Sequence, residues 1–189
     1  NARVYKGFAN PKPDEPLVFG PNIADWPAIP ALGENLLLEL AAVIRDPVTT
    51  TDELIPSGET SSYRSNPEKL ASFTLSRRAP DYVPRSRAVR ALEAARQSGE
   101  APAALVKALS VVSDTPETLL KTTQFASCIF AEKPGDGSAR EQAASCQRVL
   151  GGAANICREY ATKRYRSNCV NWGILPFTIG AEEPFPFEP

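Results

Sequence analysis

Apolar runs and helical patterns alternate from residue 123 to residue 179, and this alternation constrains the fold more than any other feature. "TQFASCIFAE" (123–132) is rich in β-forming apolar residues and predicts a buried central strand. A small-residue helical pattern follows over 138–152, then a short strand and a helix over 154–168, and a last strand over 172–179. Strands and helices that alternate in this way predict an α/β sandwich.

The residues before this stretch add one more strand and a long loop. "ENLLLELAAVIRD" (34–46) fits a strand by its alternating leucines, although Leu, Glu and Ala also favour helix. Residues 46–67 are polar, rich in Thr and Ser, and contain prolines and glycine, so they predict a loop. Loops of this length without an evident helix or strand are uncommon and often functional.

Four helices are predicted between this loop and the central strand, over 66–75, 85–99, 101–112 and 115–122. The first has Asn66 as N-cap and Pro67 at its first position, where proline is tolerated. The second carries an apolar stripe and ends at Gly99, a natural C-terminal glycine. We expect these helices to serve packing.

The first 33 residues differ in composition from the rest of the chain. They are rich in proline and glycine, which predicts an extended arm (1–33) before a folded domain (34–189). Phe19, Ile23 and Trp26 are candidate anchors of the arm, and a partly disordered linker from an upstream domain is the alternative. The first two residues, Asn and Ala, are interpreted as the remnant of a tag.

The overall composition excludes several classes of function. The chain has 189 residues with a net charge of −1, so nothing suggests nucleic acid as the main partner. It contains no apolar run of about 20 residues, and no secretory signal is visible, so a cytoplasmic protein is expected. Histidine is absent, which removes Ser-His-Asp and Cys-His catalysis from the chain. Acid–base chemistry must come from carboxylates, Tyr, Lys, Cys or an activated hydroxyl.

The four cysteines predict buried small side chains rather than a metal site. Cys128, Cys146, Cys157 and Cys169 form no C-x-x-C pair, whereas structural zinc and iron–sulfur sites normally use close pairs. Each stands among apolar or small residues, where cysteine usually acts as a small hydrophobic side chain. Two disulfides stay open as an alternative, but the cytoplasm disfavours them.

The segment "GDGSAREQAA" (135–144) has the composition of an anion-binding turn. Two glycines permit a tight turn after the central strand, and a helix follows whose first N–H groups are unpaired and carry a positive field. Ser138 is placed to cap this helix, with Glu141 completing a capping box. Arg140 adds a guanidinium for a carboxylate or phosphate. A plain capped helix is the alternative interpretation.

A second constellation lies in the 46–67 loop. Asp52 and Arg64 are separated by turn-forming sequence, so they could pair with each other or line a ligand site together.

Taken together, these segments resemble the C-terminal "swivel" domain of aconitase-like hydro-lyases. That family has a T-T-D-H-I-type segment, an arginine twelve residues after its aspartate, and G-E-G-S-S-R-E-H-A-A followed by a basic residue and L-G-G. The corresponding stretches here are "TTDELIPSG" (50–58), Arg64, and "GDGSAREQAA" followed by "CQRVLGGAANI" (146–156). The family's N-x-x-x-x-G-L-L-P-L-type ending corresponds to "NCVNWGILPF" (168–177), so the resemblance covers roughly residues 36–179.

The resemblance implies a swivelling β/β/α three-layer domain and assigns roles to four residues. Ser138 matches the catalytic base that abstracts a proton beside a substrate carboxylate. Arg140 matches the arginine that binds substrate and helps to stabilise the serine alkoxide, and Arg64 matches the arginine that holds a substrate carboxylate. Asp52 matches the acid of the T-T-D segment and is expected to orient the site.

Four positions depart from the family pattern. Ala139 replaces the second serine, Gln142 and Glu53 stand where histidine is usual, and Ile55 falls where aconitases place a serine. These changes keep the base and both arginines but put citrate-type specificity in doubt. An aconitase-like hydratase of a hydroxy di- or tricarboxylic acid is therefore expected.

The resemblance also implies a [4Fe–4S] cluster, whose cysteine ligands lie in other domains of the family. None of the four cysteines here matches them, so the chain is expected to supply half an active site and to be inactive alone. Its partner would be the cluster-binding domains of the same polypeptide or a large subunit. The alternatives are a free-standing small subunit of an isopropylmalate-isomerase-type enzyme and a non-catalytic regulatory or RNA-binding module.

Overall fold

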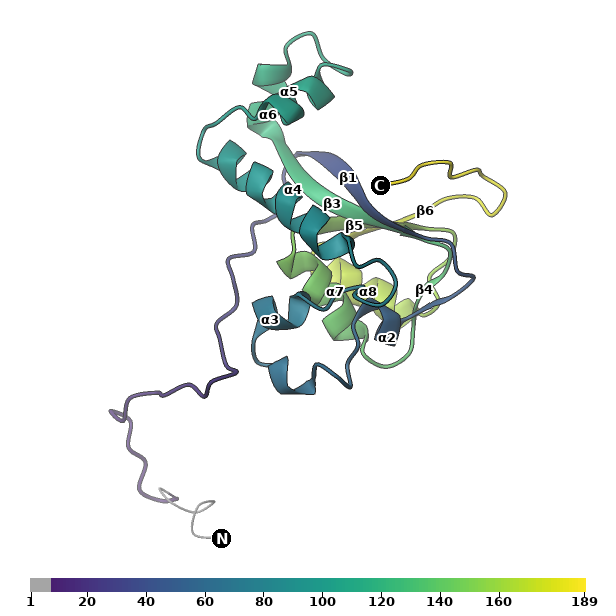
Figure 1. The fold of residues 1–189 in the computed structure, drawn as a ribbon. Helices are drawn as coiled ribbons and strands as arrows, with labels where there is room; N and C mark the ends of the chain where they lie inside the picture. The colour runs from purple at the N-terminus through teal and green to yellow at the C-terminus, as the bar shows by residue number, and fades with distance from the viewer. Residues whose placement is uncertain (1–7) are drawn as a thin grey trace.

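The computed structural model describes residues 8–189 and is built around a parallel sheet (Figure 1). The sheet has four strands in the order β1-β3-β5-β6, and each strand is parallel to its neighbours. The strands are β1 (Asn35–Ile44), β3 (Thr123–Ala131), β5 (Gly152–Cys157) and β6 (Leu175–Thr178). Every residue of β3 is buried, so the predicted central strand is confirmed.

The connections between these strands carry the helices. Between β1 and β3 the chain forms the short α2 (Thr51–Leu54), then α3 (Pro67–Ala71), α4 (Tyr82–Gln97), α5 (Ala103–Leu109) and α6 (Pro116–Thr122). α7 (Arg140–Val149) joins β3 to β5, and α8 (Lys163–Asn171) joins β5 to β6. Parallel strands added in one direction by right-handed crossovers place their helices on one face of the sheet. Figure 1 shows α4, α7 and α8 together on one side of the sheet.

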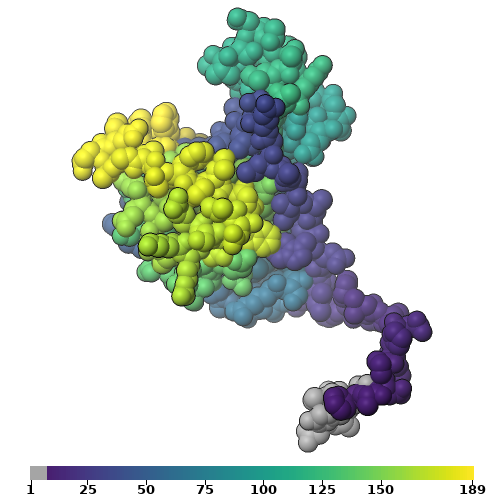
Figure 2. Space-filling model, turned by 180° about the vertical axis from the view of Figure 1, so that it is seen from behind, coloured from purple at the N-terminus to yellow at the C-terminus, as the bar shows by residue number. Residues whose placement is uncertain are grey.

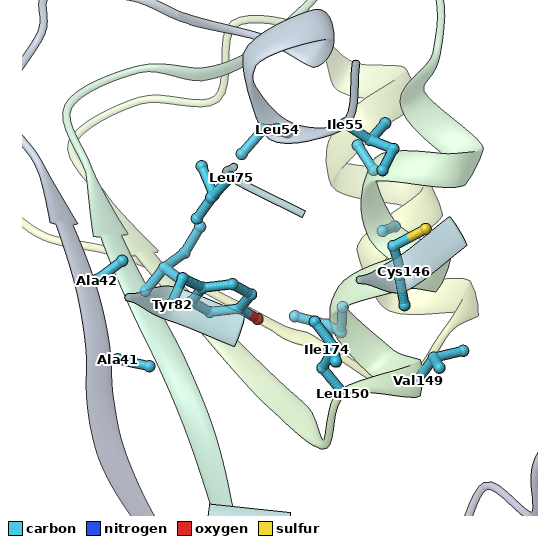
Figure 3. Packing of buried hydrophobic residues seen from close by; sticks show 14 of the residues in the cluster. Ala41, Ala42, Leu54, Ile55, Leu75, Tyr82, Cys146, Val149, Leu150 and Ile174 are labelled. Atoms are coloured by element: carbon cyan, nitrogen blue, oxygen red, sulfur yellow. The ribbon is translucent and has the colours of Figure 1, made fainter. Parts of the chain in front are cut away.

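The largest group of buried side chains fills the space between this face and the helices. Figure 3 shows Leu75 and Tyr82 near Ala41 and Ala42 of β1, with Cys146 of α7 across the same interior. A second, smaller cluster packs α4, α5 and α6 against the start of β3 around Phe125. Alternate residues of β3 face opposite sides, so Phe130 lies on the other face, where it stacks on Phe185 of the C-terminal tail at 3.9 Å between ring centroids.

The predicted α/β class is confirmed, since the chain is a mixed α/β fold with a parallel sheet and helices. The strand over 34–46 and the helices after it are also confirmed, with Asn66 accepting from the Lys69 N–H as the cap of α3 at 3.0 Å. The prediction of a featureless 46–67 loop is wrong. It holds β2 (Thr49–Thr50), α2 (Thr51–Leu54) and η1 (Ser61–Tyr63).

Short polar elements explain that error. Thr50 caps α2 by accepting from the Glu53 N–H at 3.2 Å, and Glu53 accepts from the Thr50 N–H at 2.7 Å. This capping box begins a helix of a single turn. One turn is too short to show the repeat of apolar residues by which a helix is recognised in a sequence.

The first part of the proline-rich arm extends away from the body of the domain (Figure 2), and its later part, from about residue 24, lies against the domain. Of the predicted anchors, Trp26 stacks on Trp172 with ring centroids 5.0 Å apart, whereas Phe19 and Ile23 stay exposed. The tag interpretation of the first two residues falls outside the described residues. Among helices of residues 8–189, none is long and apolar enough to cross a membrane.

Candidate functional site

A two-stranded parallel pair brings the two sequence motifs together. β2 pairs with β4 (Pro134–Asp136), so that Thr49 lies beside Pro134 and Thr50 beside Asp136. The carboxyl ends of the two strands therefore meet at one edge. The Asp52 segment leaves β2 there, and the Gly137–Ser138 turn leaves β4 there.

The two turns are in direct contact. The Ala139 N–H donates to the Thr51 hydroxyl at 3.3 Å, and Thr51 is 2% exposed. Gly137 has a φ of +124°, and a Cβ added to it would lie less than 3.0 Å from Thr51 Oγ1. Only glycine fits this close approach at this φ.

Ser138 is not the cap of the following helix, contrary to the prediction. The helix α7 begins at Arg140 with Ala139 as its N-cap residue, and no side chain caps it. The predicted capping box is therefore wrong as well. Glu141, which would form the other half of the box, instead accepts from Trp172 Nε1 at 2.5 Å and from Asn168 Nδ2.

The loss of the cap leaves an open helix N-terminus. Within residues 8–189, the N–H groups of Arg140, Glu141 and Gln142 have no acceptor. The exposed Ser138 hydroxyl has no partner there either, and it stands where the helix field favours negative charge. The Arg140 side chain is half-buried, and its Nε is buried without a partner among the same residues. The turn has the donors of an anion site.

Asp52 pairs with an arginine that sequence reasoning missed. Its carboxylate lies 3.0 Å from Arg77 Nη1 and accepts from the Ser57 N–H at 3.2 Å. Arg77 also pairs with Glu59 at 2.5 Å, so Asp52 belongs to an exposed network rather than to a pair with Arg64. No sequence spacing would have indicated Arg77, because it lies 25 residues after Asp52 and only the fold of the chain brings the two side chains together.

Arg64 ends η1 with its side chain exposed and, in the described part of the chain, without an ion pair. It lines a cavity of about 170 Å³ together with Glu141 and Gln142 from the first turn of α7. The structure therefore places Arg64 beside the first turn of α7, the helix that follows Ser138. Ser138 and Arg140 themselves do not line this cavity.

The positions that depart from the family pattern have structural roles here. Ile55 is fully buried in the core, so a serine would be out of place there. Glu53 caps α2 and accepts from Arg78 Nε at 2.6 Å. Burial opposes ionisation of Glu53, but the Thr50 and Arg78 hydrogen bonds outweigh it and lower its pKa. Gln142 faces the Arg64 cavity.

The cysteines are free and buried, as expected of small hydrophobic side chains. Burial raises the pKa of the Cys157 thiol to about 11 and the pKa of the other three thiols to about 12, which disfavours the thiolate that binds metal. Residues 8–189 contain no group of three His, Cys, Asp or Glu side chains that could hold a metal ion. The described residues therefore do not fit an iron–sulfur cluster.

Comparison with known proteins identifies a family for the second half of the chain. No curated protein matches the chain. The family model of the aconitase C-terminal domain matches residues 104–182, a span that runs from α5 past β6 and includes Ser138 and Arg140. The identified family agrees with the resemblance seen in the motifs, and this part of the chain belongs to the aconitase C-terminal domain family.

Proposed function

We propose that the chain is the C-terminal domain of an aconitase-like hydro-lyase that acts on a hydroxy di- or tricarboxylic acid. The observation that carries the proposal is the junction of the two motif turns at the β2–β4 edge. There an uncapped helix N-terminus, an exposed serine and an unpaired arginine lie together beside the Asp52 segment. In this proposal the folded domain is 34–189, and residues 1–33 are an interdomain linker.

Ser138 acts as the base in this reaction. Its alkoxide removes a proton from the carbon beside a substrate carboxylate, the C–H electron pair forms a C=C bond, and the hydroxyl on the neighbouring carbon leaves as hydroxide. The proton taken by the serine and this hydroxide together make up the water that is lost, and the reverse reaction adds it. The unpaired N–H groups of α7 and the Arg140 guanidinium lower the free energy of the alkoxide because they place positive charge beside it.

The arginines hold the substrate. Arg140 and Arg64 lack carboxylate partners among residues 8–189, so both guanidinium groups are available for bidentate pairing with substrate carboxylates. Asp52 fixes the turn between α2 and η1 through Arg77 and Ser57, and in this proposal it keeps Arg64 in position.

The proposed reaction needs a partner. Aconitase-type hydro-lyases use a [4Fe–4S] cluster as Lewis acid, and the described residues offer no ligands for it. The cluster would be supplied by other domains of the same polypeptide or by a large subunit, and the 189-residue chain by itself is expected to be inactive.

The test uses the full-length polypeptide, or the complex with the large subunit, with its cluster reconstituted and a panel of hydroxy acids as substrates. Ser138→Ala is expected to lower kcat by about 10²–10⁴-fold, the contribution of general-base catalysis. Ser167→Ala, an exposed serine on α8, is the matched control and should keep full activity. Full turnover by Ser138→Ala would remove the base assignment.

Arg64 has a separate test in the same assay. Arg64→Gln is expected to raise KM roughly ten- to hundredfold with a smaller change in kcat, because it removes a charged hydrogen bond to the substrate. An unchanged KM would show that Arg64 does not bind substrate.

A further inference from the structure

The cavity beside Arg64 is an apolar chamber with one cation at its side. Leu70 of α3 and Cys146 and Val149 of α7 form its buried floor. Trp26 of the arm and Trp172 after α8 line it as a stacked pair, with ring centroids 5.0 Å apart and ring planes 27° from parallel. The remaining lining residues are Arg64, Pro67, Glu141, Gln142 and Ser145.

The arm wall of the cavity is fixed by hydrogen bonds on both sides of Trp26. The Ala24 N–H donates to the Ser65 carbonyl at 2.9 Å, beside Arg64. The Gly33 N–H donates to Gln124 Oε1 at 2.7 Å, and Arg148 donates to the Pro30 carbonyl. Trp26 is therefore held against the domain over the cavity.

The charges at the cavity favour an anion. Among residues 8–189, Glu141 is the one acid that lines it, and its carboxylate oxygens already accept from Trp172 Nε1 and Asn168 Nδ2. Arg64 has no ion pair within residues 8–189 and keeps a free guanidinium fork. A carboxylate complements this fork, and the apolar walls complement a hydrocarbon group attached to it.

We propose that this cavity binds a carboxylate with a bulky apolar substituent, the carboxylate pairing with Arg64 and the substituent lying against the Trp26–Trp172 pair. The volume of about 170 Å³ suits a ring or a branched alkyl group, since a cavity of about 150 Å³ holds benzene. Binding itself is independent of the chemistry at Ser138. The identification of the ligand as an alkyl- or aryl-substituted hydroxy acid substrate rests on the proposed function.

The sequence provides a direct reporter for this site. The chain has two tryptophans, and both belong to the stacked pair. Tryptophan fluorescence of the 189-residue chain should change saturably with phenylsuccinate, which joins carboxylates to one ring. Succinate lacks the ring and benzyl alcohol lacks the carboxylate, so each should bind at least about tenfold more weakly.

Two variants test the two halves of the interaction. Arg64→Gln should weaken phenylsuccinate roughly ten- to hundredfold and leave benzyl alcohol unchanged. Arg87→Gln, an exposed arginine on α4, is the matched control and should bind like the unaltered chain. Ser145→Leu, which fills the cavity, should abolish the saturable change, with the melting temperature as a check that the variant is folded.

The proposal fails if phenylsuccinate gives no saturable change, or if Arg64→Gln and the unaltered chain bind it equally. Either result would make the cavity a packing gap under the arm. Since these measurements need no cluster and no turnover, they separate this proposal from the proposed function. Binding without activity in the assembled enzyme would contradict only the hydro-lyase assignment.

Discussion

Gly137→Ala tests whether the contact between the two motif turns is as close as the structure has it. The new Cβ would lie less than 3.0 Å from the Thr51 hydroxyl, at a backbone φ of +124° that residues with a Cβ rarely adopt. Thr51 is 2% exposed and cannot swing into solvent. The substitution must therefore strain the backbone, push the turns apart, or both.

Both costs can be estimated. A positive φ costs a residue with a Cβ about 1–2 kcal/mol, and forcing a methyl group into a packed contact costs typically about 1–3 kcal/mol. We expect Gly137→Ala to lower the free energy of unfolding by about 2–5 kcal/mol. Gly99→Ala is the control for strain alone, because Gly99 has a φ of +91° with no atom within 4 Å of the added Cβ. It should cost about 1–2 kcal/mol.

Thr51→Ala isolates the steric part. It removes Oγ1 of residue 51. The nearest remaining atom of residue 51 to the Cβ added at position 137 is then its Cβ, at 3.4 Å, which is an ordinary contact. Alone it loses the Ala139 hydrogen bond, at a cost of about 1 kcal/mol. In the double variant the clash is absent, so its destabilisation should fall short of the sum of the single variants by about 1–3 kcal/mol.

Urea unfolding of the four proteins of this cycle measures the coupling. Additive free energies within about 0.5 kcal/mol would refute the reasoning, because they would show that Thr51 does not limit the space at Gly137. A Gly137→Ala value equal to that of Gly99→Ala would have the same consequence.

The remaining predictions concern stability and reactivity away from the site. Burial opposes ionisation of Glu93, but hydrogen bonds, chiefly from Arg96, outweigh it and lower the pKa of Glu93 below 4.5. The ionised side chain therefore contributes fully to the free energy of unfolding above pH 4.5, and this contribution is lost as the pH falls through the lower pKa of the folded state. Glu93→Gln should cost about 2 kcal/mol at neutral pH and flatten this acid loss in urea titrations. Phe185→Ala should remove about 1 kcal/mol by ending the stack on Phe130 and should speed proteolysis of the tail, whereas Phe187→Ala, at a 62% exposed ring, should change less. Ellman's reagent should label no thiol of the native chain and all four after denaturation, because burial raises each thiol pKa.

Long periodic segments were predictable because their pattern is local. The unbroken apolar run of β3 and the capped pattern of α3 each follow from residues within one element, and both are confirmed. The motif residues could likewise be read in order, and the family model agrees over 104–182. The roles of Ser138, Arg140, Arg64 and Asp52 stay predictions.

The errors at the cap of α7 and at Asp52 occurred where residues distant in the sequence compete for the same group, whereas the 46–67 segment was missed because its elements are too short to show a period. Glu141 has the spacing of a capping residue, but Trp172 and Asn168, far along the chain, engage its carboxylate, and no side chain caps α7. Asp52 likewise pairs with Arg77.

The sequence by itself determined the α/β class, the order of the four sheet strands and of the helices from α3 to α8, and the residues of the two motifs, since these depend on local propensity and periodicity. Only the tertiary structure decided which motif residues touch, because such contacts depend on how the packed elements are placed. The β2–β4 pairing joined the motifs, and the Trp26–Trp172 stack closed a cavity beside Arg64. The sequence marked Trp26 as a candidate anchor, but neither its partner Trp172 nor the β2–β4 pairing has a signature in the residues that form it.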